Sequence, residues 1–245
     1  MKREYWFILI VYIAMQLSGF IGVPITSLIL GMIGFETGQS QAFAGIIWLV
    51  FSFSVTLIIV LVLLRKEMIQ AQAERNGASI GRSILWAITG VFLALFAQAF
   101  AANIERLIGI EMGSENTQQI LRIIESFPIM IVVSSVIGPI LEEIVFRKII
   151  FGAFYKRFNF FLSALLSSVI FSFAHMEPEH TLLYSAMGFT FAYLYVKTNR
   201  ILVPIVAHVA MNTFVVLVQS IYREDIEKLM KQAEQMQSFI GGFFL

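Results

Sequence analysis

Cysteine is absent from all 245 residues of the sequence. Its absence excludes disulfide bonds, thiol nucleophiles and zinc or iron–sulfur centres held by cysteine. Charge is also scarce, because Asp, Glu, Lys and Arg make up only 13% of the chain, whereas a soluble domain usually has about 25%. Hydrophobic residues make up 58%, and the mean hydropathy is +0.83. These values predict an integral membrane protein.

The small net charge bears on possible partners, and the uniform composition bears on domain organisation. The formal net charge is +1, and the chain has no basic stripe or aromatic-interleaved Lys/Arg cluster, so no nucleic-acid partner is expected. Membrane lipids are the expected surroundings. The sequence shows no internal repeat, low-complexity tract or domain boundary. Residues 1–245 are therefore predicted to form a single membrane domain.

Long apolar stretches are what the sequence has in abundance. A bilayer core about 30 Å thick needs roughly 20 apolar residues of helix. Seven stretches qualify or nearly qualify, which predicts an all-α polytopic bundle of about seven transmembrane helices followed by a polar C-terminal tail, 222–245. The predicted helices are 6–33, 42–64, 83–103, 128–154, 160–175, 180–197 and 201–221.

Basic residues predict the orientation, because lysine and arginine are retained on the cytoplasmic side. With the N-terminus inside and the C-terminus outside, ten of the seventeen fall in cytoplasmic segments: Lys2, Arg3, Arg65, Lys66, Arg75, Arg82, Lys156, Arg157, Lys197 and Arg200. The outside loops 34–41 and 176–179 hold none, and 104–127 is expected to be a further outside loop. In the outside segment HMEPEH, we expect Glu177, Glu179 and His180 to be solvated.

Few ionisable residues remain inside the predicted helices, and each needs an explanation. A carboxylate at mid-bilayer depth costs roughly 2.5–3.5 kcal/mol on insertion scales. Glu143 and Arg147 are four residues apart and share a helical face, which predicts an ion pair. Glu142 points about 100° away from Glu143. It is therefore expected to stay free for chemistry, and Gly138–Pro139 just before it predicts a kink.

Two further helices carry polar residues at helical spacing. FSFAH places Phe171 and His175 on one face, and HVAMN does the same for His208 and Asn212. A histidine and an amide on one face can together donate hydrogen bonds to an oxyanion. With a carboxylate to activate water, this set favours amide hydrolysis. Each residue alone also has a structural interpretation: a histidine bonded to a backbone carbonyl, an amide between helices, or a core phenylalanine.

Three segments in this order, EEIVFR at 142–147, FSFAH at 171–175 and HVAMN at 208–212, resemble the CAAX prenyl protease and bacteriocin-processing (CPBP) family of intramembrane proteases, which includes type II CAAX endopeptidases. The family pattern is EExxxR, then FxxxH, then HxxxN or HxxxD, and this sequence does not depart from it. The resemblance covers about 128–221, the predicted catalytic core.

The resemblance implies a role for each matching residue. Glu142 activates water with His175 beside it, and His208 with Asn212 stabilises the oxyanion. The remaining motif positions support the site: Glu143, Arg147 and Phe171. The family cleaves membrane-associated substrates, some of them prenylated, so a peptide or membrane-anchored protein is the expected substrate, and the bacterial plasma membrane is the expected location.

The sequence leaves the use of a metal and the function class open. Glu142, His175 and His208 could supply a zinc set with water as the fourth ligand, although HExxH is absent. The oxyanion pair needs no ion and uses Asn212, so no cofactor is the favoured prediction. A non-catalytic membrane protein, such as a bacteriocin immunity factor or scaffold, is the main alternative. A transporter is disfavoured because the membrane-embedded ionisable residues all fall in the second half.

Overall fold

The computed structural model of the chain describes residues 1–73, 77–111, 113–222, 225 and 228, which form helices and no β-strand. Most of the predicted tail, 222–245, lies outside the described residues. The elements in chain order are α1 (Arg3–Met32), α2 (Thr37–Ala73), α3 (Ile80–Leu107), α4 (Glu115–Ser126), α5 (Met130–Val132), η1 (Val133–Ile137), α6 (Gly138–Glu142), η2 (Glu143–Phe151), α7 (Gly152–Tyr155), α8 (Phe160–Phe173), η3 (Pro178–His180), α9 (Thr181–Thr198) and α10 (Leu202–Ile221).

An all-helical fold follows from the apolar composition. A backbone in lipid must satisfy its own hydrogen bonds, which a helix does within one segment. Four helices are long and apolar enough to cross a membrane, namely α1, α2, α3 and α10, and α8 is a shorter apolar helix. The prediction of an all-α membrane bundle is therefore confirmed.

The seven predicted stretches all fall on helix, but several boundaries differ. Helices α2 and α3 extend beyond the predicted 42–64 and 83–103, and the helix predicted at 160–175 ends at Phe173. The expected loop 104–127 contains α4, whose Ser114 N-cap oxygen accepts a hydrogen bond from the Thr117 N–H at 3.0 Å. Helix α4 was missed because only one of its faces is apolar, and that face packs with Met130 and Val216.

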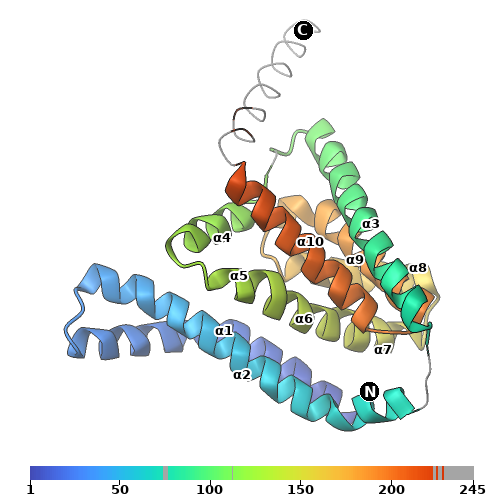
Figure 1. Ribbon diagram of the computed structural model, residues 1–245, viewed down its shortest axis with the longest axis horizontal. Helices are drawn as coiled ribbons and strands as arrows, with labels where there is room; N and C mark the ends of the chain where they lie inside the picture. The colour runs from blue at the N-terminus through green and yellow to red at the C-terminus, as the bar shows by residue number, and fades with distance from the viewer. Residues whose placement is uncertain (74–76, 112, 223–224, 226–227, 229–245) are drawn as a thin grey trace, which may run out of the picture.

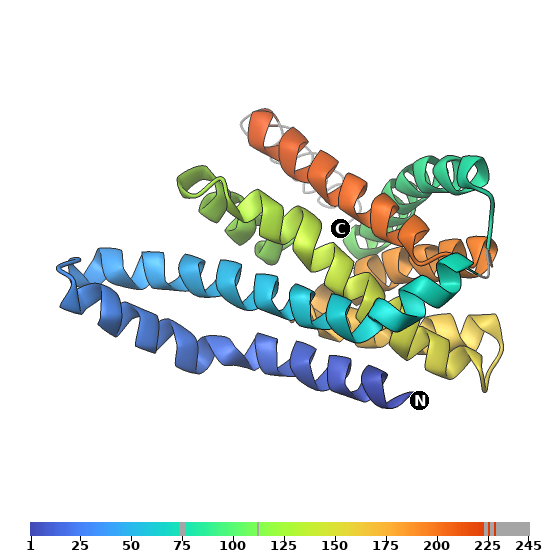
Figure 2. The ribbon, with the colours of Figure 1, turned by 60° about the horizontal axis from the view of Figure 1, so that its bottom comes forward.

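Two groups of helices flank a central one (Figures 1 and 2). Helices α1 and α2 form a long antiparallel hairpin on one side, and α3, α8, α9 and α10 pack together on the other. The central segment, α5 to α7, runs between them and contacts both groups. We call the end of the bundle where α1 begins and α2 ends the basic end. There Glu67 binds Lys2 of the N-terminus at 3.0 Å and Lys148 of the central segment at 2.6 Å.

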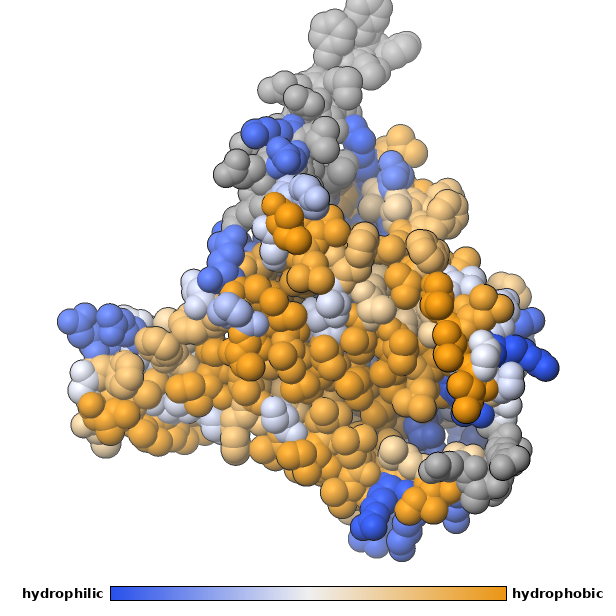
Figure 3. All heavy atoms as spheres, viewed as in Figure 1, coloured by the Kyte–Doolittle hydropathy of each residue, from blue (hydrophilic) through white to orange (hydrophobic). Residues whose placement is uncertain are grey.

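The surface is largely apolar, as expected of a membrane protein. Figure 3 shows hydrophobic residues covering most of one face, while hydrophilic residues gather at its edges. Large exposed side chains include Phe20, Phe92 and Phe96, at 82%, 67% and 71% relative exposure. Exposed apolar patches of this extent fit a lipid environment rather than water.

The central segment is a continuous run in which α-helical winding is interrupted twice by π-helical winding. Two π-helical stretches, η1 and η2, flank the short α6. Such stretches are rare and occur frequently at functional sites. Gly138 and Pro139 begin α6. The kink predicted at Gly138–Pro139 stays a prediction, and the structure shows π-helical winding before Gly138, in η1, and from Glu143 onward, in η2.

Helix α9 packs very closely against α8. A Cβ atom on Gly188 would lie only 2.7 Å from Ser168 Oγ and 3.2 Å from its Cα, so only glycine fits there without a shift. Ser167, the neighbour of Ser168, donates a hydrogen bond to the Phe146 carbonyl of η2 at 2.8 Å. These contacts hold α8, α9 and the central segment together around the glutamates.

Candidate active site

The adjacent glutamates lie in different surroundings. Glu143 begins η2 and its side chain is fully buried, whereas Glu142 ends α6 and its side chain is 21% exposed. Glu143 Oε2 lies 3.2 Å from Arg147 Nε, so the predicted ion pair is confirmed. Among the described residues Glu142 forms no ion pair with Arg147. One carboxylate is thus buried in an ion pair, and the other is partly exposed.

Arg147 is held in an aromatic environment. Its guanidinium carbon lies 4.2 Å from the ring centroid of Phe171 and 5.4 Å from that of Phe191. Its side chain is only 2% exposed. A desolvated guanidinium is attracted by the faces of aromatic rings. The rings therefore add to the attraction of Glu143 and compensate the buried charge.

His208 of α10 lies between the two carboxylates. Its Nδ1 lies 2.9 Å from Glu143 Oε1, and its Nε2 lies 3.8 Å from Glu142 Oε2. Because Glu143 is paired with Arg147 and an ionised carboxylate only accepts hydrogen bonds, His208 Nδ1 carries the proton. Nε2 can therefore donate a hydrogen bond only when both ring nitrogens are protonated. The ring itself stacks on Phe191, with centroids 4.5 Å apart.

His175 follows the end of α8 and its tautomer is also fixed. Its Nδ1 lies 2.8 Å from the Phe171 carbonyl oxygen, so Nδ1–H donates and the neutral ring leaves Nε2 free to accept. The Glu142 carboxylate is close enough to interact with His175 electrostatically. The ring of Phe171 packs near both histidines, since its centroid lies 4.5 Å from that of His175 and 6.3 Å from that of His208.

Asn212 lies one helical turn beyond His208 on α10, as the spacing predicts. Its side chain is half-buried and forms no hydrogen bond within the part of the chain that the structure describes. A half-buried amide without a partner has two donors and an acceptor available to a ligand. The structure therefore brings Glu142 and His208 together. Asn212 lies on the next turn of α10, and His175 lies just after α8.

Two tyrosines at the site were not predicted. Tyr12 of α1 is buried and close enough to Glu142 to interact electrostatically, and Tyr184 of α9 stacks on His175 with ring centroids 4.1 Å apart. Neither belongs to a polar motif, and an isolated tyrosine in an apolar helix cannot be told from an ordinary residue of the hydrophobic core. Only the close packing of α8 against α9 would have indicated the role of Tyr184.

The segment HMEPEH differs from the prediction. Glu179 is exposed as expected, but Glu177 and His180 are buried, so the expectation that they are solvated was wrong. Glu177 accepts hydrogen bonds from the Asn116 N–H and the Ser114 hydroxyl, each at 2.8 Å, and from the Tyr184 hydroxyl. These partners come from the N-cap and first turn of α4, a helix that was not predicted, and from α9.

His180 is held by two acceptors. Its Nδ1 lies 2.9 Å from Glu105 Oε2, and its Nε2 lies 3.1 Å from the Gly113 carbonyl oxygen. Because both partners only accept, both nitrogens must carry protons. Burial alone would lower the pKa of His180, but the hydrogen bond and charge of Glu105 outweigh it and raise the pKa above its ordinary value. Burial alone would raise the pKa of Glu177, but the Asn116 N–H and Tyr184 hydroxyl outweigh it and lower the pKa.

The candidate zinc set is not arranged for an ion here. Tetrahedral zinc sites need three protein ligands at about 2.0–2.2 Å from one point. No group of three His, Asp or Glu side chains in the described ranges could hold a metal ion. His208 and His175 each hold Nδ1 in a hydrogen bond, which leaves Nε2 as the nitrogen that could bind an ion. The side chains of Glu142, His175 and His208 as they lie here nevertheless do not converge on one point.

Comparisons with known proteins agree with the motifs. A profile of the family described as "Type II CAAX prenyl endopeptidase Rce1-like" matches residues 124–214. The chain is 51% identical over 249 residues to "Putative membrane peptidase YdiL" of Bacillus subtilis (strain 168), covering 100% of both chains. It is 35% identical over 169 residues to "Membrane-embedded CAAX protease MroQ" of Staphylococcus aureus (strain USA300), which covers 66% of this chain and 67% of that one. No solved structure matches significantly. The motif match and the full-length similarity show that the chain belongs to the type II CAAX prenyl endopeptidase Rce1-like family.

Proposed function

We propose that this protein is an intramembrane endopeptidase that hydrolyses a peptide bond of a membrane-associated protein or peptide with water activated by Glu142. The observation that carries the proposal is the division between the adjacent carboxylates. Glu143 is fully buried between Arg147 and His208, whereas Glu142 is partly exposed and faces His208 Nε2 at 3.8 Å. A purely structural pair would have no reason to leave one carboxylate open.

In the proposed reaction, Glu142 takes a proton from water while the water oxygen attacks the carbonyl carbon of the peptide. His175 Nε2 accepts the second water hydrogen and orients the nucleophile, because its Nδ1–H is fixed on the Phe171 carbonyl. Negative charge then develops on the carbonyl oxygen. Fixed donors at that position lower the barrier.

Asn212 and His208 are the proposed donors to that oxyanion. The amide of Asn212 has no other partner, and protonated His208 presents Nε2–H beside Glu142. Collapse of the tetrahedral intermediate breaks the C–N bond, and the proton held by Glu142 passes to the leaving amine. This route uses no metal ion.

The substrate and the orientation are also proposals. The CAAX protease name of the Staphylococcus aureus relative supports a membrane-anchored substrate, prenylated or unprenylated. The basic end holds Lys2, Lys148 and Glu67 in one cluster together with the start of α3 and the end of α9. The excess of lysine and arginine there supports a cytoplasmic N-terminus in a bacterial plasma membrane.

The test is cleavage of a panel of fluorogenic peptides, prenylated and unprenylated, by the detergent-purified protein with and without a chelator. Glu142→Gln should lower kcat by about 10²–10⁴-fold, as expected for loss of a general base, and Asn212→Ala by about 10²–10³-fold, as for an oxyanion donor. Glu179→Gln is the matched control, since this glutamate is exposed and belongs to none of the three motif segments.

The outcomes separate the mechanisms. Wild-type activity that survives the chelator but is lost in Glu142→Gln supports glutamate-activated water. Activity lost with the chelator and restored by zinc contradicts the metal-free route. Full activity in Glu142→Gln contradicts the assigned base, and absence of wild-type cleavage across the panel favours a non-catalytic scaffold or immunity factor.

A further inference from the structure

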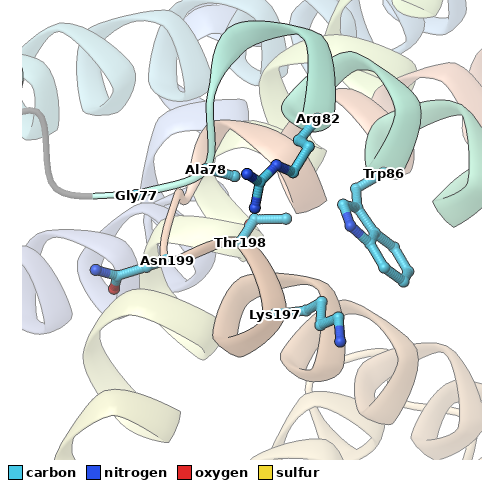
Figure 4. Close-up of a pocket in the computed structure, with 7 residues that line it drawn as sticks. All are labelled: Gly77, Ala78, Arg82, Trp86, Lys197, Thr198 and Asn199. Atoms are coloured by element: carbon cyan, nitrogen blue, oxygen red, sulfur yellow. The ribbon is translucent and has the colours of Figure 1, made fainter.

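A pocket at the basic end lies far from the glutamates in sequence and is not used by the proposed reaction. It has a volume of about 510 Å³ and lies between the start of α3 and the end of α9. Figure 4 shows Arg82 and Trp86 extending from α3 toward the end of α9, where Lys197 and Thr198 lie. Gly77, Ala78 and Asn199 complete its lining.

Two of the lining side chains carry uncompensated positive charge. Within the ranges that the structure describes, neither Arg82 nor Lys197 has a carboxylate partner. Lys197 Nζ lies 5.6 Å from the ring centroid of Trp86, an aromatic contact that leaves its ammonium hydrogens available. The Thr198 carbonyl of the lining accepts a hydrogen bond from the Ala78 N–H at 2.9 Å, and backbone groups carry no formal charge that could balance the two cations. Two cations in one hollow attract an anion.

Two contacts join the chain segments that border the pocket. Arg200 donates from Nε to the Ala78 carbonyl at 2.6 Å, which ties the segment before α3 to the loop after α9. Gly77 has a φ of +136°, and a Cβ there would lie 2.8 Å from Arg200 Cγ. The glycine geometry and the hydrogen bond therefore hold the turn on one side of the pocket, while the side chains of Arg82 and Lys197 are exposed and can reach a ligand.

Apolar side chains continue from the pocket along α3. Ile84, Leu85 and Ile88 are 57%, 62% and 55% exposed and follow Arg82 within two helical turns. Trp86 lies one helical turn after Arg82, among these apolar residues, and contacts Lys197; tryptophan is enriched at membrane–water interfaces. A ligand that fits both parts has an anionic head and hydrocarbon chains, which describes a phospholipid rather than a soluble anion.

The geometry points to a binding site for the phosphate of an anionic phospholipid, with Arg82 and Lys197 at the phosphate, Trp86 at the glycerol level and the acyl chains along α3. Anionic lipids attract basic residues at the cytoplasmic surface, with about 1 kcal/mol for each Lys or Arg. The site would fasten the ends of α3 and α9 to that leaflet. It is independent of the assignment of Glu142.

Native mass spectrometry of the full-length, delipidated protein in detergent tests the site. The protein is titrated with phosphatidylglycerol, with phosphatidylcholine of the same chains, and with phosphatidylglycerol in the presence of inorganic phosphate. Wild type should bind one phosphatidylglycerol in preference to phosphatidylcholine, and Arg82→Gln/Lys197→Gln should weaken that event by roughly 30-fold. The control Arg65→Gln/Lys66→Gln removes two exposed charges at the end of α2 and should leave it unchanged.

Several results would overturn the assignment. An equal loss of phosphatidylglycerol binding in both double variants would indicate general attraction to the charged surface. Unchanged binding in both would contradict the proposed site. Displacement of the lipid by inorganic phosphate would identify a site for the free anion instead. Gel filtration and the melting temperature of each variant establish that a lost binding event does not reflect unfolding, and the conservative Lys197→Arg should retain the lipid.

Discussion

Replacement of Arg147 by methionine tests the buried charge pair at the centre of the site. Methionine keeps much of the length and apolar volume of the arginine stem but removes its charge, so the change leaves Glu143 without its cationic partner. Breaking a buried pair by removing one member costs about 3–5 kcal/mol, because an uncompensated charge remains. The contacts of the guanidinium with Phe171 and Phe191 are lost as well.

The magnitude follows from these contacts. A desolvated cation–π interaction contributes about 2 kcal/mol, which adds to the cost of the lost pair. The hydrogen bond from His208 to Glu143 Oε1 remains and offsets part of the sum, since a bond to a charged group contributes about 1.5–3 kcal/mol. We expect Arg147→Met to lose about 4 kcal/mol of unfolding free energy. For a chain of this size that loss corresponds to a fall in Tm of roughly 8–16 °C.

The assay is thermal unfolding of purified variants in the same detergent, with Arg65→Met as the control for an exposed arginine. The double variant Glu143→Leu/Arg147→Met removes both charges and should recover most of the Tm, because a buried ion pair can be replaced by apolar residues at little cost. Wild-type stability in Arg147→Met, or a double variant less stable than the single one, would refute the pairing argument.

Two further predictions concern the groups that sequence reasoning missed. Tyr184→Phe keeps the ring against His175 but loses the hydroxyl bond to Glu177, so we expect only a modest change in kcat. Tyr184→Leu removes the ring and should lower kcat by tenfold or more with little change in KM. Equal kinetics for the two variants would contradict a role for the stacked ring. The pKa of His180 is raised in the fold by Glu105, so its contribution to stability is full below the unfolded value of about 6.5 and is lost as pH rises through the folded pKa. The melting temperature should therefore fall across that range in wild type and vary less in His180→Gln, and an identical pH dependence in the two proteins would count against the Glu105 contact.

The sequence predicted the parts of the fold that depend on local spacing. Apolar length located the membrane helices, and the four-residue spacing of Glu143 and Arg147 predicted an ion pair that the structure contains. Helix α4 escaped because a search for long apolar runs passes over a helix with only one apolar face, although that periodicity and the Ser114 N-cap are local signals.

Long-range contacts explain what was missed at the site. His208 lies between Glu142 and Glu143 because α10 packs against the central segment, and no spacing within one helix shows this. Glu177 was expected to be solvated because it sits in a short polar loop. Its partners come from Ser114 and Asn116, about sixty residues earlier in the chain. Polar loop residues become buried when another segment covers them.

The adjacency of the two glutamates has a physical use that neither residue would have alone. Neighbouring helical positions point in different directions, so one short segment can direct Glu143 to Arg147 and direct Glu142 to the open side. His208 contacts both carboxylates, with Glu143 fixing the proton on Nδ1 and Glu142 facing Nε2. In the proposed reaction, Glu143 is therefore a positioning residue that sets which nitrogen of His208 faces the substrate. On that proposal, a charge that costs energy in the membrane is retained because it orients the group that would act on the substrate.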